Sequence, residues 1–166
     1  MNFTGLSQVY RELLEKFPCI VSLEDPFHFE DWGAFAALTE ELGLNTQILG
    51  DLHSASNSTL VLDCVEAKSI NGVTIRLNEA GTVSEMIEIV QTARSEGWGV
   101  VTSMSKLEVD DSFLSDFSVG VKAGLIKVGS MKGGIERICK LNQLLRIEKN
   151  LGDSSYFAGD RWRNTG

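Results

Sequence analysis

The sequence predicts an α/β protein with a parallel sheet, because short β-rich runs alternate with longer amphipathic runs along the chain. We count about five strands and six helices in βα order, which favours parallel strands joined by right-handed crossovers. The 166 residues are 43% hydrophobic, which suffices to bury a core. With only two prolines and no low-complexity linker, we expect a single domain.

The first elements follow from helical and strand periodicity. Apolar residues recur at helical spacing over 6–17, and Pro18 ends that helix before a strand-like run at 19–23. A second apolar stripe at 32–42 is closed by a glycine, and residues 46–49 again resemble a strand.

The same alternation continues to the end of the chain. The expected elements are a helix at 57–70, a strand at 73–77, a helix at 82–96, a strand at 98–102, a helix at 110–119, a strand at 125–128 and a helix at 135–151.

Composition excludes several classes of protein. The formal net charge of −8 is spread along the chain, which disfavours binding to a nucleic-acid backbone. No apolar run approaches the roughly 20 residues of a membrane span, and no secretory signal is visible, so we expect a cytoplasmic protein. Cys19, Cys64 and Cys139 form no CxxC pair and are expected to be reduced and partly buried.

The functional candidates lie at the carboxyl ends of the predicted strands, where parallel α/β folds carry their sites. Carboxylates on adjacent strand ends suit Mg²⁺, and cations beside them suggest an anionic substrate. The plainer alternative is that these acidic residues are helix caps or solvated groups. The residues concerned are Glu24, Asp25, Asp51, Arg76, Asn78, 103–106 and Lys127.

Seven strings of residues resemble enolase, in order from about residue 6 to residue 161. They are VSLEDPF (21–27), ILGD (48–51), LNEAGTVSE (77–85), GWGV (97–100), IKVG (126–129), KLNQLLRIE (140–148) and FAG (157–159). Several of these strings are specific to enolases, so the chain is identified as a member of that family.

The resemblance implies a partial enolase-type (β/α) TIM-like barrel, with 1–166 as its C-terminal part and no N-terminal capping domain. The family reaction is the dehydration of 2-phosphoglycerate to phosphoenolpyruvate in glycolysis. It uses Mg²⁺ and a basic residue, the known scheme for this superfamily. Carried onto this chain, the metal ligands fall on Glu24 and Asp51.

The main departure is at Arg76, which stands where the family has its lysine base. A general base must spend part of its time unprotonated, and arginine stays protonated in proteins. We therefore expect an impaired or inactive enzyme, with metal binding weakened or lost. The divergent enolase 4 type is one subgroup in which such a sequence could belong.

A second departure concerns substrate binding. Enolases carry a Ser-His-Arg-Ser string where this chain has Ser103-Met104-Ser105-Lys106, so that only Ser103 is kept. Lys106 would be a point charge in place of a bidentate arginine. Lys127 matches the second active-site lysine and is expected to contact a substrate carboxylate or a metal.

The glycine-rich stretch 129–134 and His53 can each be interpreted in two ways. The glycine-rich stretch 129–134 could bind phosphate or serve as a flexible connection, and it is not a Walker motif. His53 follows Asp51 closely and is either a ligand or an ordinary loop residue, while His28 matches no catalytic histidine of the family.

About five strands cannot close a barrel, so we expect open edges that pair with the rest of the barrel or with another subunit, giving an oligomer. Three functions stay open. The chain is an active enolase whose missing parts lie elsewhere, a non-catalytic scaffold or partner subunit, or a module that binds 2-phosphoglycerate or phosphoenolpyruvate without turnover. Arg76 favours the last two.

Overall fold

The computed structural model describes residues 3–104, 109–130 and 134–163. Its centre is a sheet of parallel strands in the order β1-β2-β3-β4-β5, which is also their order along the chain. The strands are β1 (Ser22–Glu24), β2 (Gln47–Gly50), β3 (Gly72–Arg76), β4 (Gly99–Ser103) and β5 (Leu125–Lys127).

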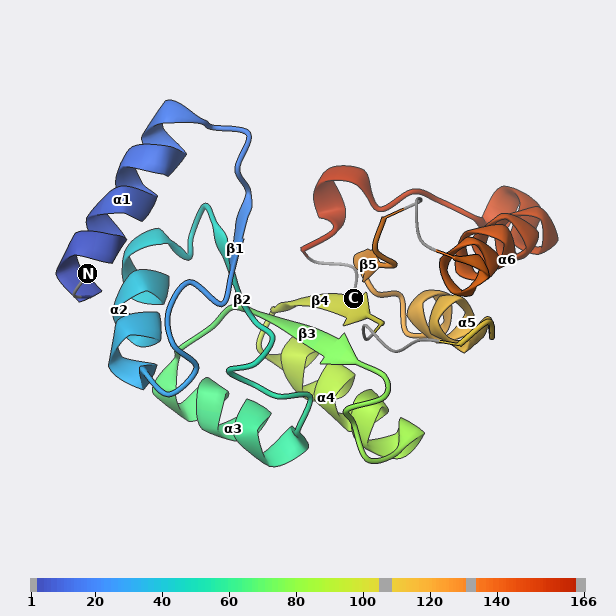
Figure 1. The fold of residues 1–166 in the computed structure, drawn as a ribbon, viewed down its shortest axis with the longest axis horizontal. Coiled ribbons are helices and arrows are strands. Elements are labelled where there is room, and N and C mark those ends of the chain that lie inside the picture. Colours follow the sequence, from blue (N-terminus) through green and yellow to red (C-terminus); the bar gives the residue numbers. More distant parts are fainter. Residues whose placement is uncertain (1–2, 105–108, 131–133, 164–166) are drawn as a thin grey trace.

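The helices follow one another in chain order around the outer side of this sheet (Figure 1). Within the described ranges they are α1 (Phe3–Lys16), α2 (Trp32–Leu42), α3 (Ser58–Ala67), α4 (Val83–Ser95), α5 (Phe113–Gly120) and α6 (Ile135–Leu151), with short 3₁₀ turns η1 (Gly152–Ser154) and η2 (Gly159–Arg161).

The sequence predicted the order of the elements correctly, but it began the first strand at residue 19, before the observed start of β1 at Ser22, and extended two helices too far. The helix expected at 57–70 ends at Ala67, because Lys68 takes the left-handed conformation (φ 51°) and caps it. The helix expected at 110–119 begins only at Phe113, because the Asp111 carboxylate accepts a hydrogen bond from the Phe113 amide (2.9 Å) and forms a turn instead.

Strand periodicity separates the two faces of the sheet. Alternate residues such as Ile48, Val73 and Val100 face the helices and belong to two apolar clusters that join helices to strands. The other residues face the inner, concave side, so that Asp51 and Arg76 share a face with the residues two and four positions before them. Asp51 and Arg76 therefore lie on the inner face.

The amino-terminal end of this inner face is filled by one polar side chain. Gln47 of β2 reaches across β3 and β4, and a Cβ on either Gly72 or Gly99 would overlap its amide group. The Gln47 amide also donates to the Asn71 carbonyl. The glycines at the starts of two neighbouring strands thus make room for a polar floor beneath the candidate site.

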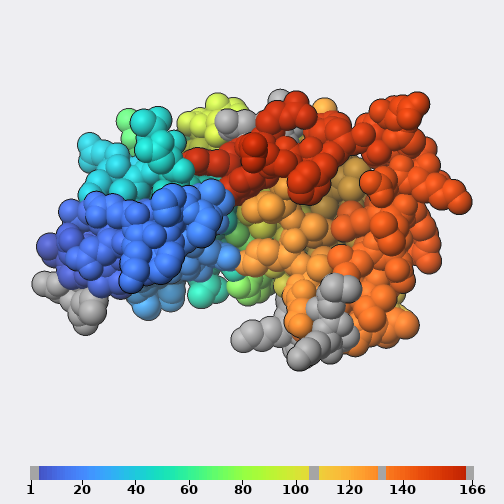
Figure 2. Space-filling model, turned by 90° about the horizontal axis from the view of Figure 1, so that it is seen from above, coloured from blue at the N-terminus to red at the C-terminus, as the bar shows by residue number. Residues whose placement is uncertain are grey.

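The C-terminal segment returns across the amino-terminal ends of the strands. The Arg163 guanidinium donates to the Asn45 carbonyl (3.0 Å) and the Gly43 carbonyl (3.3 Å), just before β2. At the other side, the Trp162 backbone packs on Gly124, just before β5. Figure 2 shows this segment running from the C-terminal helix back toward the first helices.

The sheet is an open half-barrel, as the sequence predicted. In the ranges that the structure describes, β1 pairs only with β2 and β5 only with β4, so each has one free edge. Among the described residues no helix is both long and apolar enough to cross a membrane.

Candidate functional site

Four charged residues from four different strands meet at the carboxyl ends of the sheet. Glu24, Arg76 and Lys127 are the last residues of β1, β3 and β5, and Asp51 directly follows β2. Arg76 Nη2 lies 2.5 Å from Asp51 Oδ2, Lys127 Nζ lies 3.6 Å from the same oxygen, and Lys127 also pairs with Glu24. The structure thus brings together four of the charged residues that the strand-end rule selected.

Asp51 is the buried centre of this cluster, with only 4% of its surface exposed. Its backbone is fixed by Asp25, whose carboxylate accepts hydrogen bonds from the Asp51 amide and the Leu52 amide (both 2.9 Å). Asp25 itself has a positive φ of 42°, which is uncommon for a residue other than glycine. The sequence marked Asp25 as a strand-end candidate and gave no sign of this supporting role.

Arg76 is held on both its backbone and its side chain. Its amide donates to the Ser56 hydroxyl (2.8 Å), and its Nη1 lies 3.0 Å from Glu79 Oε1. The hydrogen bond with Asp51 raises the pKa of the Arg76 guanidinium above its already high value, and Glu79 adds to this effect, while burial opposes it. Arg76 is therefore a permanent cation in this site.

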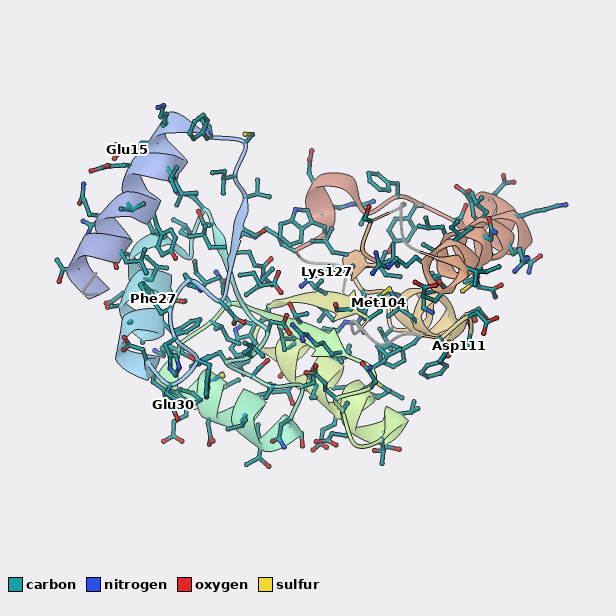
Figure 3. All side chains as sticks on the ribbon, in the orientation of Figure 1. Glu15, Phe27, Glu30, Met104, Asp111 and Lys127 are labelled. Atoms are coloured by element: carbon teal, nitrogen blue, oxygen red, sulfur yellow. The ribbon has the colours of Figure 1, made fainter. Side chains whose placement is uncertain are left out.

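Lys127 links the two edge strands of the half-barrel. Figure 3 shows it near Met104, whose amide donates to the Lys127 carbonyl (3.3 Å). Burial raises the pKa of the Glu24 carboxyl, and the hydrogen bond from Lys127 works in the opposite direction. The Glu24 and Lys127 side chains remain about one third exposed (32% and 39%), so this pair is open to solvent.

Ser103 lies between Arg76 and Lys127 in the strand register. It is buried, and its hydroxyl donates to the Met104 carbonyl (3.2 Å). Among the described contacts it has none with the four charged side chains. Ser105 and Lys106, which the sequence placed in the same loop, lie outside the described residues. The same holds for residues 131–133 of the glycine-rich stretch.

In the contacts that the structure describes, Asn78 is not joined to the four charged residues. It lines a pocket of about 520 Å³ between the β3–α4 loop and the start of α5, together with apolar residues including Met86 and Phe113.

His53 is a buried structural residue, in agreement with the plainer of the two interpretations. Its Nδ1 lies 2.6 Å from the Phe29 carbonyl and its Nε2 lies 3.0 Å from the Ser69 hydroxyl, while its ring stacks on Phe35. Since the Phe29 carbonyl can only accept, Nδ1 carries the proton. His28, in contrast, is exposed beside Glu30.

Comparison with known proteins assigns the chain to a family. The family model of the enolase C-terminal TIM barrel domain matches residues 1–165. The chain belongs to the enolase family. It is 45% identical over 155 residues to cytosolic enolase 3 of Arabidopsis thaliana, covering 93% of this chain and 32% of that protein.

Two other enolases show the same extent of similarity. The enolases of Eimeria tenella and Solanum lycopersicum are each 40% identical, over 159 and 158 residues, which is 96% and 95% of this chain. Each match covers 35% of the relative, so the chain spans about a third of the length of the curated enolases that it matches.

The Mg²⁺ that the enolase resemblance implies fits this donor set poorly. Within the described ranges no three His, Cys, Asp or Glu side chains come together as a possible metal site. Glu24 and Asp51 are already paired with Lys127, and Asp51 also with Arg76. Asp51 Oδ1 is a buried oxygen without a described partner and has the character of a vacant ligand.

Proposed function

We propose that this enolase-family chain is a non-catalytic member of the family, acting as a scaffold or partner subunit in the cytoplasm. On this proposal it does not by itself convert 2-phosphoglycerate to phosphoenolpyruvate. The cytoplasmic location draws support from the name of the relative cytosolic enolase 3.

One observation carries the proposal: Arg76, which the resemblance aligns with the family base, is paired with Asp51 and Glu79. Proton abstraction needs a group that is unprotonated near neutral pH, and both partners of Arg76 stabilise its charged form. Other parts of a barrel can be supplied by another chain segment. Additional chain segments cannot, however, turn Arg76 into an uncharged group that acts as a base.

A binding function at the same site is the second candidate. Lys127 is about 39% exposed and lies beside Arg76, so a small carboxylate or phosphate such as 2-phosphoglycerate could pair with it. In this candidate, as in the scaffold candidate, Arg76 cannot act as a base and there is no turnover. The two differ only in that the binding candidate keeps affinity for the ligand.

The test is an assay of phosphoenolpyruvate formation by the purified chain with saturating Mg²⁺. We expect no activity above that of a Glu24→Ala variant prepared in the same way. Activity that follows the protein through purification and disappears in Glu24→Ala would overturn the proposal. Calorimetric titration with 2-phosphoglycerate then separates the scaffold from the binding candidate.

A further inference from the structure

We propose that Arg76 takes the place of a divalent cation at the Glu24–Asp51 carboxylates, so that this site is organised by the chain's own charges and binds no metal. The inference concerns cation binding and goes beyond the proposed function, which concerns turnover. Either can fail while the other stands.

The first argument is the burial of Asp51. An ionised carboxylate that is 4% exposed needs a counter-charge, because removing it from water is costly. Arg76 supplies this charge at 2.5 Å on Oδ2, and Lys127 lies 3.6 Å from the same oxygen. One of the two Asp51 carboxylate oxygens is therefore already paired with two cations of the chain.

The second argument is the local balance of charge. Glu24 and Asp51 contribute two negative charges, and Arg76 and Lys127 contribute two positive charges, all linked by direct ion pairs. The two cations compensate these two carboxylates and would repel a divalent cation that approached them.

The third argument is that the site is already rigid. Both carboxylate oxygens of Asp25 hold the backbone at Asp51, and Ser56 holds the backbone of Arg76. These bonds position the carboxylate and the guanidinium without help from a metal. Asp51 Oδ1 needs only a neutral donor, such as a water molecule, which leaves the charge balance unchanged.

The experiment measures binding of Mn²⁺, a spectroscopic substitute for Mg²⁺, by electron paramagnetic resonance on the full chain. We compare the unchanged chain with Arg76→Met, which keeps the length of the side chain and removes its charge. The matched control is Arg11→Met, since Arg11 forms a surface ion pair with Glu41 (3.3 Å) far from the strand ends. Should Arg76→Met fail to fold, Arg76→Gln replaces it, because it also removes the charge and its amide can still donate a hydrogen bond to the carboxylate.

We expect no saturable Mn²⁺ binding in the unchanged chain or in Arg11→Met at millimolar metal. In the Arg76 variant we expect binding at least about tenfold tighter, which an added Glu24→Gln substitution removes. Saturable binding by the unchanged chain that depends on Glu24 and Asp51 would overturn the proposal. A folded Arg76 variant that still binds no Mn²⁺ would also overturn it, because the guanidinium would not be what excludes the cation. Neither result depends on whether the chain turns over 2-phosphoglycerate.

Discussion

At the scale of single residues, Asp25 does more than its place beside Glu24 suggests. Both of its carboxylate oxygens accept backbone hydrogen bonds, from Asp51 and Leu52, and these fix the loop that carries the buried carboxylate. The same residue adopts a positive φ, a conformation that aspartate and asparagine tolerate better than most residues.

Replacing Asp25 should therefore destabilise the strand-end loop. We expect Asp25→Ala to lower the free energy of unfolding by about 2 kcal/mol, because two amides lose their acceptor. Asp25→Asn should cost about half of that, since it keeps one acceptor oxygen and tolerates the backbone conformation. Urea unfolding of the chain measures both, with Asp153→Ala on the exposed η1 turn as the control. Equal losses for Ala and Asn would contradict this account.

His53 makes stability depend on pH. Burial lowers the pKa of its imidazole below the usual 6.5, although the Phe29 carbonyl and the Asp25 charge oppose the shift. The unfolded chain therefore takes up a proton at a higher pH than the folded chain does. The stability from neutral His53 is complete above about pH 6.5 and is lost as the pH falls through that value toward the folded pKa.

The measurement is the free energy of unfolding of the unchanged chain and of His53→Gln between about pH 7.5 and about pH 5. We expect a smaller loss on acidification in the variant, because its side chain does not titrate. His28→Gln serves as the control, since His28 is exposed and pairs only with Glu30 in the described contacts. A pH dependence unchanged by His53→Gln would show that other groups cause it.

At the scale of elements, a close contact at Gly124, just before β5, holds the C-terminal segment in place. Gly124 leaves no room for a Cβ because the Trp162 backbone packs on it, whereas Gly33 in α2 is exposed with nothing near its Cβ position. We expect Gly124→Ala to cost about 2 kcal/mol by overpacking. The same substitution at Gly33 should add about 0.5–1 kcal/mol, because alanine favours the helix.

Two measurements test this pair of variants. Urea unfolding gives the two changes in stability, and trypsin cleavage after Arg161 and Arg163 reports release of the C-terminal segment. Faster cleavage is expected only in Gly124→Ala. Similar cleavage in both variants would mean that the segment is not held by this contact.

The elements themselves could be predicted from the sequence because their periodicities are local. The strand at 73–77 and the helix at 135–151 follow from apolar spacing and were placed within one residue of their observed bounds. The helix ends at Lys68 and Asp111 were missed, because a left-handed cap on lysine and a turn closed by an aspartate leave little mark on apolar spacing.

The charged residues of the site could be predicted from the sequence, but the hydrogen bonds that hold them in place could not. Glu24, Asp51, Arg76 and Lys127 were selected because carboxyl ends of parallel strands converge. The hydrogen bonds of Asp25 and the polar floor at Gln47 depend on side chains crossing between strands, and single-strand periodicity does not contain that information. The assigned roles as ligand, base position and substrate contact stay predictions.

At the scale of the whole molecule, the half-barrel exposes two strand edges with apolar residues beside them. Val21, next to β1, is 47% exposed and Leu125 of β5 is 40% exposed. Free backbone groups next to apolar surface favour association with another chain.

We therefore expect the chain in isolation to self-associate or to be unstable. Sedimentation velocity over a wide concentration range should show a mass that rises with concentration. Adding the remaining part of an enolase barrel as a separate polypeptide should reduce this self-association, since it would compete for the same edges. A cooperatively folding monomer at all concentrations would contradict the prediction.

The ion pair between Lys127 and Glu24 joins residues 103 positions apart, and the contact of Arg163 with Asn45 joins residues 118 positions apart. Contacts that close such long loops form late in folding, because the chain loses conformational entropy on closing the loop before the contact stabilises it. Both links would then be absent from the folding transition state. Their strength sets how slowly the native chain opens, and the speed at which it folds is decided by the neighbouring βα units.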